Sequence, residues 1–567
     1  MSGKAKQYEV SNGRLYAALL LMGLCAVVLV ARAVQLQVMD TDFLQGQGNA
    51  RHLRVVEIPA TRGRITDRNG EPLAVSTPVE SVWVNPPELL QSPESIIPLA
   101  AVLGVRASDI ERKLTQRAEK EFAWLKRRLI PREADRIRDL QLPGVFLQKE
   151  YRRFYPAHEV TSHILGFTNI DDIGQEGLEL AYDNWMRGIP GQKRVIKDRL
   201  GRIIEEVELI REAQPGNDLH LTIDRRLQYL AYRELQRTLL EHQARSGSVV
   251  LLDVKTGEIL AMVNLPAYNP NQAVKSDGES LRNRAVTDVF EPGSVIKPFV
   301  VAAALESGEY TPTSPIDTAP GRLPVSGHMI HDVRDFGLID VTRVLTKSSN
   351  VGITKIALSL EPEQMWSTYS RFGFGKVTGT GFPGESAGVL RNYQRWRLLE
   401  QATISYGYGL SVTPLQLAQA YAALANNGTL RPPVFILDAV NPPVSVLDPK
   451  LARQIAAMLE TVLGPEGTGK KARVANYRVA GKTGTSRKAV AAGYEDRYVA
   501  SFAGFAPASN PRLVCVAVVN DPAGETYYGG QVAAPLFSRI MRGALRVIDI
   551  PPDDYQGMVA GTSGRGK

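Results

Sequence analysis

The sequence predicts an α+β protein with one membrane anchor followed by two modules, and three observations support this. One apolar run lies near the N-terminus, and a stretch with Pro, Gly and Asn at 212–218 separates two regions of different texture. The C-terminal region begins with two strand patterns, continues with helical patterns and ends with three more strand patterns. This order is typical of a layered fold with an antiparallel sheet. We expect one module over 41–215 and another over 216–550.

The composition of the 567 residues excludes several classes of protein. Apolar residues make up 44% and charged residues 22%, which excludes a disordered or collagen-like chain. The slightly negative mean hydropathy excludes a membrane protein with many spans. The net charge of +8 is not concentrated in one block, so we expect no nucleic-acid partner. Two distant cysteines and seven scattered histidines predict no disulfide framework, metal site or cofactor.

The apolar run Leu15–Ala31 is long enough to span a bilayer, because at about 1.5 Å per residue it reaches roughly 26 Å. Lys4, Lys6 and Arg14 precede it, so the positive-inside rule places the N-terminus in the cytoplasm and the rest of the chain outside. A cleaved signal peptide is the alternative, but its apolar region is usually only about 7–15 residues long, and Arg32 lies where cleavage would occur. The predicted segments are a cytoplasmic tail over 1–14 and a transmembrane anchor over 15–34.

The module over 41–215 contains no candidate chemistry. Asp67–Gly70 is a turn signal between two short β-like runs, and the charged residues 107–139 predict solvent-facing helices. A nucleophile, a base and an orienting residue do not occur together here. We therefore expect a structural or interaction module.

The module over 216–550 has a clearer pattern of elements. Residues 248–253 and 259–263 predict two strands around a hairpin turn. The segment over 551–567 has little apolar content and predicts a disordered tail. The other predicted elements are helices after Ser294 and over 343–358, 414–426 and 450–463, strands over 478–486, 498–505 and 513–520, and a final helix over 534–546.

The first of three candidate motifs is the pair Ser294 and Lys297. Ser294 opens a helical pattern after Pro292-Gly293, and N–H groups at a helix N-terminus favour developing negative charge nearby. Lys297 projects from the same face one turn later, and a desolvated neutral lysine can act as the base for a serine nucleophile. By itself, the pattern is better explained by a Ser N-cap and a solvated lysine.

The second motif is Ser348 and Asn350, 54 residues further on and between helical stretches. In an extended or loop backbone the two side chains point to the same side. There a hydroxyl and an amide can relay a proton and hold a carbonyl group. Alone, these residue types indicate only a turn.

The third motif is Lys482, Thr483, Gly484 and Thr485, in a strand-like run. The glycine lets a ligand backbone lie against the strand, the Thr hydroxyls can bond a carboxylate, and the lysine attracts it. An edge strand with a glycine bulge is the alternative. Lys255–Gly257 repeats three of the same letters in a hairpin turn, so single short matches also arise without function.

The three motifs, in this order and in helix-start, loop and strand contexts, resemble those of the penicillin-binding protein and serine β-lactamase superfamily. Further stretches are similar to class B penicillin-binding proteins, above all to those of the division septum, and the resemblance covers nearly the whole chain. It implies an antiparallel sheet with helices on both faces, a helical subdomain, and an N-terminal pedestal or dimerisation-type domain. The stretches are Arg62–Gly70, Arg153–Pro156, Gly177–Glu179 and Tyr408–Gln416.

The resemblance implies a serine D,D-transpeptidase that cross-links peptidoglycan stem peptides and that β-lactams inhibit. Ser294 would attack the penultimate D-Ala carbonyl, and Lys297 would be its base. Ser348 would pass the proton to the leaving amine, and Asn350 would hold the acyl-side amide. The resemblance also assigns Lys482, Thr483, Gly484 and Thr485 to carboxylate binding, and places Arg487, Tyr498 and Tyr528 as lining residues from position alone.

The acceptor and the cellular role stay open at this point. Within the same family, a D,D-carboxypeptidase or an elongation-specific transpeptidase is an alternative. Outside it, a β-lactam sensor or a catalytically silent division scaffold is an alternative. The resemblance implies attachment to the bacterial inner membrane by a single pass, with the catalytic domain in the periplasm. It also implies partnership with a septal glycosyltransferase and other division membrane proteins.

Overall fold

The computed structural model describes residues 12–39, 53–197, 203–275, 278–439, 441–490 and 493–554. Most of the tails predicted at 1–14 and 551–567 therefore lies outside the described residues. The chain divides into two compact units that interleave along the sequence. The first comprises Met1–Thr61, Pro78–Tyr151 and Gly188–Pro215, and the second comprises Arg62–Thr77, Arg152–Arg187 and Gly216–Lys567.

The N-terminal helix α1 (Asn12–Val34) continues into one π-helical turn, η1 (Gln35–Met39). Its side chains are exposed along the whole length. Within the described residues it is the one helix long and apolar enough to cross a membrane, by length and composition. Lipid is the solvent that such an apolar surface favours.

The remainder of the first unit consists of an antiparallel three-stranded sheet and a small α/β head. The predicted helical region 107–139 is only partly helical, because Ala123 and Leu129 are buried in the head core and form a strand between two helices. The sheet contains β1 (Leu53–Ile58), β6 (Gly191–Lys197) and β7 (Ile203–Arg211). The head contains the end of β3 (Pro72–Val84), α3 (Pro86–Leu90), η2 (Pro93–Ser95), α4 (Ile96–Leu103), α5 (Ala107–Thr115), β4 (Ala123–Leu129), α6 (Pro131–Leu140) and β5 (Val145–Phe154).

The second unit begins with short elements held by a buried ionic cluster. Glu179 is fully buried, and its two carboxylate oxygens accept from Arg62 at 2.7 Å and from Arg153 at 2.6 Å. Three stretches that resemble class B penicillin-binding proteins thus meet at one carboxylate. The elements here are β2 (Ile65–Thr66), η3 (His158–Val160), α7 (Ser162–Leu165), α8 (Gly177–Ala181), α9 (Asp183–Met186) and β8 (Leu219–His220).

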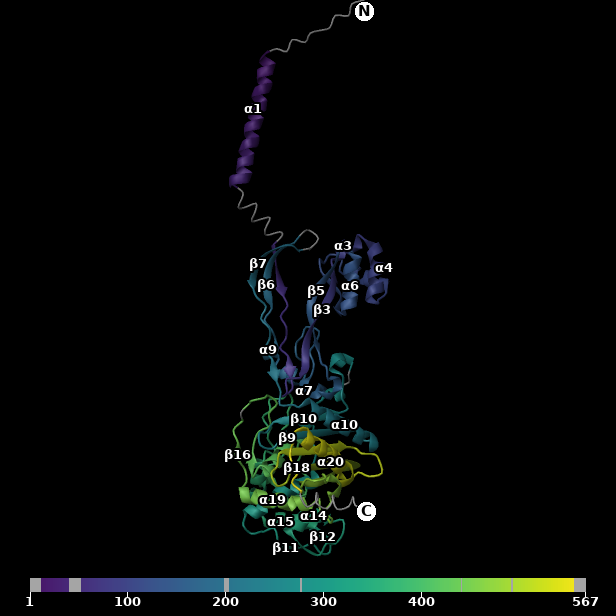
Figure 1. Ribbon diagram of the computed structural model, residues 1–567, viewed down its shortest axis with the longest axis vertical. Coiled ribbons are helices and arrows are strands. Elements are labelled where there is room, and N and C mark those ends of the chain that lie inside the picture. The colour runs from purple at the N-terminus through teal and green to yellow at the C-terminus, as the bar shows by residue number, and fades with distance from the viewer. Residues whose placement is uncertain are drawn as a thin grey trace, which may run out of the picture. The chain divides into compact units, whose positions relative to one another are not determined.

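A five-stranded antiparallel sheet in the order β10-β9-β19-β18-β17 forms the centre of the second unit (Figure 1). Gly247 lies against Leu235 of α10, whereas its neighbour Ser248 faces the side on which Pro414 begins α18. Because successive strand residues point to opposite faces, helices cover both faces. The elements are α10 (Arg225–Glu241), β9 (Ser246–Asp253), β10 (Ile259–Leu265), α18 (Pro414–Ala425), β17 (Ala480–Val490), β18 (Gly493–Ala506), β19 (Leu513–Asn520) and α20 (Gly529–Val547).

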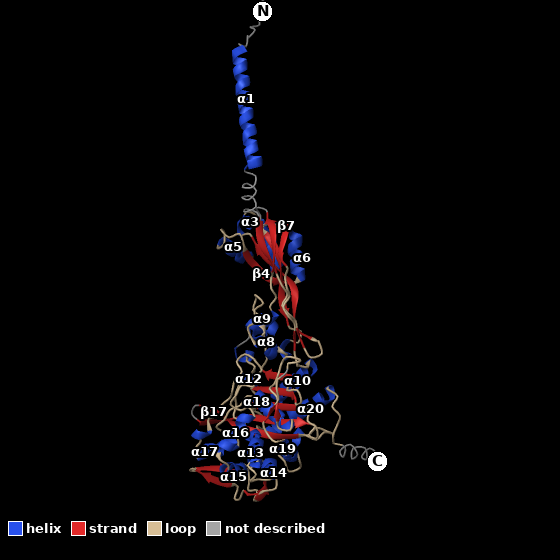
Figure 2. Cartoon of the chain, turned by 90° about the vertical axis from the view of Figure 1, so that its left-hand side faces the viewer, coloured by secondary structure: helices blue, strands red, loops and turns tan. Residues whose placement is uncertain are grey.

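A helical subdomain with two small two-stranded sheets, β11-β14 and β12-β13, gathers at one end of this unit (Figures 1 and 2), and β15 and β16 form a third two-stranded sheet. Every residue of α18 is buried, as expected for a helix that is apolar on all sides. The subdomain contains η5 (Gly293–Ile296), α13 (Lys297–Glu306), β11 (Pro315–Asp317), β12 (Arg322–Val325), β13 (His328–His331), β14 (Leu338–Asp340), α14 (Val341–Lys347), α15 (Asn350–Ser359), α16 (Pro362–Arg371), α17 (Leu398–Ser405), β15 (Thr429–Leu430), β16 (Val444–Ser445) and α19 (Pro449–Thr461). Shorter connecting turns are η4 (Pro270–Lys275), α11 (Gly278–Leu281), α12 (Arg284–Thr287), η6 (Tyr393–Arg395) and η7 (Lys470–Ala472).

Each strand and helix predicted for this module is found in the predicted order, with one exception, but the long helix α10 and the subdomain helices α16 and α17 were not predicted. The helix predicted over 343–358 is two helices, α14 and α15, which are interrupted at Ser348. The φ angle of Ser348 is 61°, in the left-handed region that a right-handed helix cannot include. The interruption places Ser348 at a corner instead of on a helix face.

We predict that Glu179→Gln destabilises the second unit by about 3–5 kcal/mol, because removing one charge from a buried cluster leaves the other charges uncompensated. Urea unfolding of the detergent-solubilised protein, followed by tryptophan fluorescence, measures the shift in midpoint. Glu466→Gln is the matched control, since Glu466 pairs with Arg343 and Lys347 while its side chain is 62% exposed. Equal midpoints for the two variants would contradict the prediction.

Candidate active site

Ser294 lies in the tight turn η5, just before α13. Gly293 has a φ of 57°, and its N–H donates to the Gly407 carbonyl oxygen at 3.2 Å. A Cβ atom on Gly407 would lie 2.2 Å from the Gly293 oxygen, so the two backbones approach too closely for any side chain at that position. Tyr421 of α18 donates its hydroxyl to the Val295 carbonyl oxygen at 2.8 Å. The turn is therefore held from two sides.

Lys297 begins α13 and is fully buried. Its Nζ donates to the Ser348 carbonyl oxygen at 2.6 Å and to Asn350 Oδ1 at 2.8 Å, and Ser348 Oγ lies 3.4 Å away. Burial lowers the pKa of Lys297 well below its ordinary value, and the nearby charge of Lys482 lowers it further. The structure thus favours a neutral amine, which is the form that can accept a proton.

Lys482 of β17 contacts the same hydroxyl. Its Nζ donates to Ser348 Oγ at 2.9 Å, and it is also fully buried. Burial lowers the pKa of Lys482 to about 7. The predicted partners from three distant motifs, Lys297, Ser348 and Lys482, therefore form one connected group.

The corner at Ser348–Asn350 depends on Asp332, a residue that the sequence motifs did not reveal. One carboxylate oxygen of Asp332 accepts the backbone N–H groups of Asn350 and Val351, and the other accepts the Ser349 hydroxyl. The first N–H groups of a helix have no partner within the helix, and a carboxylate satisfies them well. A Ser/Thr/Asp cap search around α15 would find Ser349 but not Asp332, because Asp332 is distant in sequence.

Ser294 Oγ has no hydrogen-bond partner among the described residues. Lys297 follows it by three residues, so the two side chains share one face of the turn. Hydrogen bonds of catalytic groups are often formed only once substrate is bound. The spacing therefore places a base beside the nucleophile without a preformed bond between them.

The strand β17 is the edge of the sheet and passes directly against the Ser294 turn. A Cβ atom on Gly484 would lie 2.9 Å from the Pro292 carbonyl oxygen and 2.3 Å from Ser501 Oγ, so this position requires glycine. Thr483 Oγ1 lies 2.8 Å from Thr468 Oγ1. Thr485 Oγ1 accepts the Gly529 N–H at 2.9 Å. Both hydroxyls therefore have protein partners beside the cleft.

The three lining residues predicted from position lie in two groups near the end of β17. Arg487 forms an ion pair with Asp496 at 2.9 Å, and its backbone N–H donates to the Tyr408 hydroxyl. Tyr498 stacks on Tyr527 at a centroid distance of 3.8 Å, and Tyr527 stacks on Tyr528 at 4.6 Å. Tyr498 is opposite Arg487 in the β17–β18 pairing, whereas Tyr528 precedes α20.

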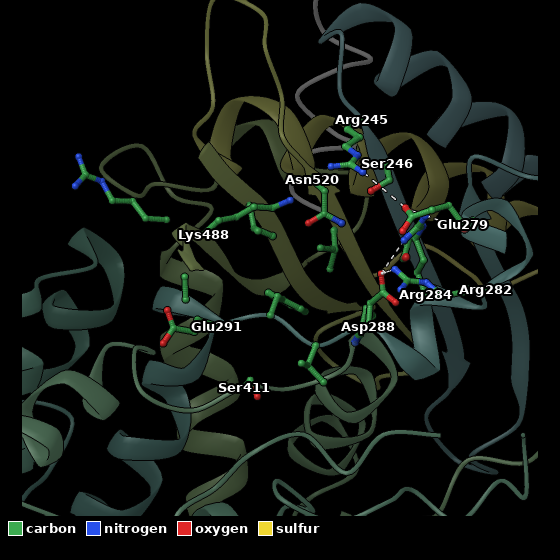
Figure 3. Close-up of a pocket in the computed structure, with 18 of the residues that line it drawn as sticks. Arg245, Ser246, Glu279, Arg282, Arg284, Asp288, Glu291, Ser411, Lys488 and Asn520 are labelled. Atoms are coloured by element: carbon green, nitrogen blue, oxygen red, sulfur yellow. Dashed lines mark hydrogen bonds and ion pairs between the residues drawn. The ribbon is translucent and has the colours of Figure 1, made fainter. Parts of the chain in front are cut away.

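A cavity of about 760 Å³ lies in the second unit, and Glu291 and Arg487 form part of its wall (Figure 3). Glu291 lies three residues before Ser294, and its Oε1 accepts the Gly409 N–H and the Tyr494 hydroxyl. Burial raises the pKa of Glu291. Glu291 was not among the predicted site residues. The one sequence feature that could have indicated it is its position directly before the Pro292-Gly293 turn.

Comparison with known proteins gives two matches to family models. The model described as penicillin binding protein transpeptidase domain matches residues 247–542. The model described as penicillin-binding protein dimerisation domain matches residues 57–221. Together they account for most of both units.

Similar curated proteins and solved structures agree with these matches. The peptidoglycan D,D-transpeptidase FtsI of Escherichia coli K12 is 44% identical over 560 residues, which are 97% of this chain and 94% of that protein. A probable peptidoglycan D,D-transpeptidase, PbpC of Pseudomonas aeruginosa, is 44% identical over 96% of this chain and 97% of its own.

The solved structure of Mycobacterium tuberculosis penicillin binding protein 3, complexed with aztreonam, has a TM-score of 0.69, 27% identity, and covers 88% of this chain and 98% of its own. The transpeptidase domain of Burkholderia pseudomallei penicillin-binding protein 3 has a TM-score of 0.54, 43% identity, and covers 59% of this chain and 97% of its own. With a transpeptidase model matching more than half of its residues and relatives similar over nearly its full length, the chain belongs to the penicillin-binding protein family.

Proposed function

We propose that this protein is a membrane-anchored serine D,D-transpeptidase that cross-links peptidoglycan stem peptides through an acyl-enzyme on Ser294. The observation that carries the proposal is the group formed by two buried lysines around one serine hydroxyl, beside the turn that presents Ser294. Two ammonium groups cannot both stay charged in such a site without a large free-energy cost. One neutral amine is therefore available as a base at neutral pH.

The acylation step uses the neutral amine of Lys297 to take the proton from Ser294 Oγ as the oxygen attacks the D-Ala carbonyl carbon. The C–N bond of the substrate breaks, and Ser348 Oγ passes a proton to the departing D-Ala amine while it receives from Lys297 the proton that came from Ser294. The side-chain oxygen of Asn350 accepts a hydrogen bond from Lys297 and so orients the lysine. The side-chain amide group of Asn350 also holds the acyl-side amide of the substrate. General acid–base steps of this kind contribute typically about 10²–10⁴-fold each.

The substrate carboxylate binds at the edge of the sheet, along β17. Lys482 contributes positive charge. Thr483 and Thr485, which carry the hydroxyl groups, flank Gly484, which has no side chain to keep a ligand from the strand backbone. Backbone N–H groups of Ser294 and Thr485 form the oxyanion hole, and one such donor is typically worth about 10²–10³ in rate. A β-lactam carboxylate occupies the same place. The part of the ligand beyond the carboxylate passes beside Arg487, Tyr498 and Tyr528.

The acceptor of the acyl group is an amine of a second stem peptide. Water as acceptor would make the protein a carboxypeptidase, but the curated relatives are named transpeptidases. The amine nitrogen forms an amide bond with the acyl carbon, the ester bond to Ser294 Oγ breaks, and the oxygen regains a proton.

The cellular setting of the proposal is the inner membrane, with α1 as a single-pass anchor and the second unit in the periplasm. The first unit is an interaction module for a septal glycosyltransferase and other division membrane proteins. Its β7 strand supports this role, because Ile204 is 67% exposed and Leu209 is 55% exposed. Exposed apolar groups in one strand are typical of interaction surfaces. The septal assignment follows the relative named FtsI.

Benzylpenicillin should add once to the protein, on the peptide that contains Ser294. The same serine attacks the β-lactam carbonyl, the lactam C–N bond breaks, and the departing nitrogen stays tethered to the acyl group, so the whole penicillin remains on the protein. Intact-mass spectrometry followed by peptide mapping measures this. Ser294→Ala should show no adduct, and an adduct on any other peptide would refute Ser294 as the nucleophile.

The rate of penicillin acylation should fall towards low pH, because protonation of Lys297, whose pKa burial holds well below its ordinary value, removes the base. It should fall again above the pKa of Lys482, which burial lowers to about 7 in the free protein, because a neutral Lys482 no longer attracts the carboxylate. Stopped-flow acylation from pH 5 to 10 gives this bell-shaped profile. An acid limb centred near pH 10, the ordinary value for lysine, would contradict Lys297 as the base.

Asp332→Asn should slow acylation roughly tenfold and move the acid limb of the profile to lower pH. The rate falls because the corner at Ser348 loses charge-assisted hydrogen bonds. The limb moves because the negative charge of Asp332 raises the pKa of Lys297, so that its removal lowers this pKa. Asp335→Asn is the control, since Asp335 lies in the same loop and accepts the Gly337 N–H instead of the N–H groups of α15. A slower variant with an unmoved limb would leave Asp332 a purely structural role.

A further inference from the structure

Glu291 is the residue through which the nucleophile turn contacts three neighbouring segments. Its side-chain Oε1 accepts the Gly409 N–H at 2.7 Å and the Tyr494 hydroxyl at 3.2 Å. Its backbone oxygen accepts the Ser486 hydroxyl at 2.7 Å. Gly409 lies in the loop after α17, Ser486 in β17 and Tyr494 in β18. The three segments therefore converge on a residue that lies three positions before Ser294.

Tyr408 and Arg487 close these contacts into a ring. The backbone N–H of Arg487 donates to the Tyr408 hydroxyl at 3.1 Å. Tyr408 is covalently joined to Gly409, and Arg487 is covalently joined to Ser486. The path from Glu291 through Gly409, Tyr408, Arg487 and Ser486 therefore returns to Glu291, and we call it the Glu291 ring. In such a network each hydrogen bond supports the others, because none can lengthen without displacing its neighbours.

The Glu291 ring joins the two backbone segments to which the proposed function assigns the oxyanion hole. Thr485, whose N–H is one donor, directly precedes Ser486 of the ring. Ser294, whose N–H is the other donor, follows Glu291 by three residues. A Cβ atom on Gly293 would lie 3.0 Å from the Thr485 carbonyl oxygen, so the turn and β17 are in contact here. Because both donors must point at one oxygen, the separation of these segments controls how well the transition state is stabilised.

Packing alone does not fix this part of the site. Glu291 and Arg487 both line the cavity of about 760 Å³ (Figure 3). Side chains next to a cavity lose van der Waals contacts on that side. Arg487 pairs with Asp496 at 2.9 Å, and among the described residues no basic side chain pairs with Glu291. The carboxyl group of Glu291 therefore contributes through the hydrogen bonds that it accepts from Gly409 and Tyr494.

We propose that Glu291 is a positioning residue for acylation, which keeps the N–H groups of Ser294 and Thr485 aimed at one oxygen. The proposal rests on the proposed function, because the oxyanion hole belongs to the acylation reaction. The oxyanion forms only as the serine attacks. A displaced donor therefore lowers the rate of acylation and leaves the binding of the unreacted ligand nearly unchanged. A misplacement of about 1 Å can cost about 10²-fold in rate.

The experiment measures stopped-flow acylation of the full-length protein in detergent by benzylpenicillin. The dependence of the rate on penicillin concentration gives the limiting acylation rate and the dissociation constant of the complex that precedes the acyl-enzyme. Glu291→Ala removes the acceptor, Glu291→Gln keeps one side-chain oxygen, and Tyr494→Phe removes one donor. Tyr310→Phe is the matched control, because the Tyr310 hydroxyl bonds Ser359 at 2.7 Å, outside the Glu291 ring.

We expect Glu291→Ala to lower the limiting acylation rate by about tenfold or more, while the dissociation constant changes by less than about threefold. Glu291→Gln should stay within about threefold of the parent rate, because its oxygen accepts the same two hydrogen bonds. Tyr494→Phe should lower the rate about threefold in the parent, and not at all when combined with Glu291→Ala, because the bond that it removes is then already absent. Tyr310→Phe should react at the parent rate.

A parent rate for Glu291→Ala, or a change in its dissociation constant alone, would overturn the positioning role while the proposed function stands. Additive effects of Glu291→Ala and Tyr494→Phe would also overturn it, since the two changes remove opposite partners of one bond. The fraction of each variant that carries the penicilloyl adduct at completion, measured by intact mass, shows how much of it is folded, and the rate constant does not depend on this fraction. Failure of the parent to form an adduct on Ser294 would overturn the proposed function, and the positioning role with it.

Discussion

The structure depends on holding two buried lysine amines against one serine hydroxyl. Lys297 and Lys482 are both fully buried, and each contacts Ser348 Oγ. Burial and mutual repulsion act in the same direction, since each favours loss of a proton from the pair. A neutral amine at neutral pH is thus a consequence of packing. The unfavourable free energy of burying these groups is offset by the large apolar core around them.

The surrounding elements restrict the geometry of this group. α18 is entirely buried and reaches the Ser294 turn through Tyr421, while β17 passes so close to the turn that Gly484 admits no side chain. Asp332 holds the start of α15, which keeps Ser348 in its left-handed conformation between two helices. Each contact joins segments that are distant in sequence. Rigid support of this kind is what catalysis by positioned groups requires.

The division of the chain into units separates chemistry from attachment. The residues of the candidate site belong to the second unit, whereas α1 and the exposed β7 strand belong to the first. The sequences of the two units are interleaved, because Arg62–Thr77 and Arg152–Arg187 contribute to the second. A module boundary drawn at one position of the sequence does not describe this arrangement. The ionic cluster around Glu179 joins these segments, since Arg62 comes from the first and both Arg153 and Glu179 come from the second.

The sequence by itself determined the five long strands of the central sheet, several of the helices around it, the apolar anchor and the identity of the motif residues, because these depend on local periodicity and on short patterns, but it missed α10. It did not reveal the break between α14 and α15, the strand β4, the role of Asp332 or the cavity beside Glu291. Those features arise from contacts between residues tens to hundreds of positions apart. Ser348 is an example: its residue type permits a helix, a turn or a loop, and only the lysines and the carboxylate that surround it select the left-handed corner. Local preferences are worth less than about 1 kcal/mol per residue, so the tertiary contacts decide wherever the two compete.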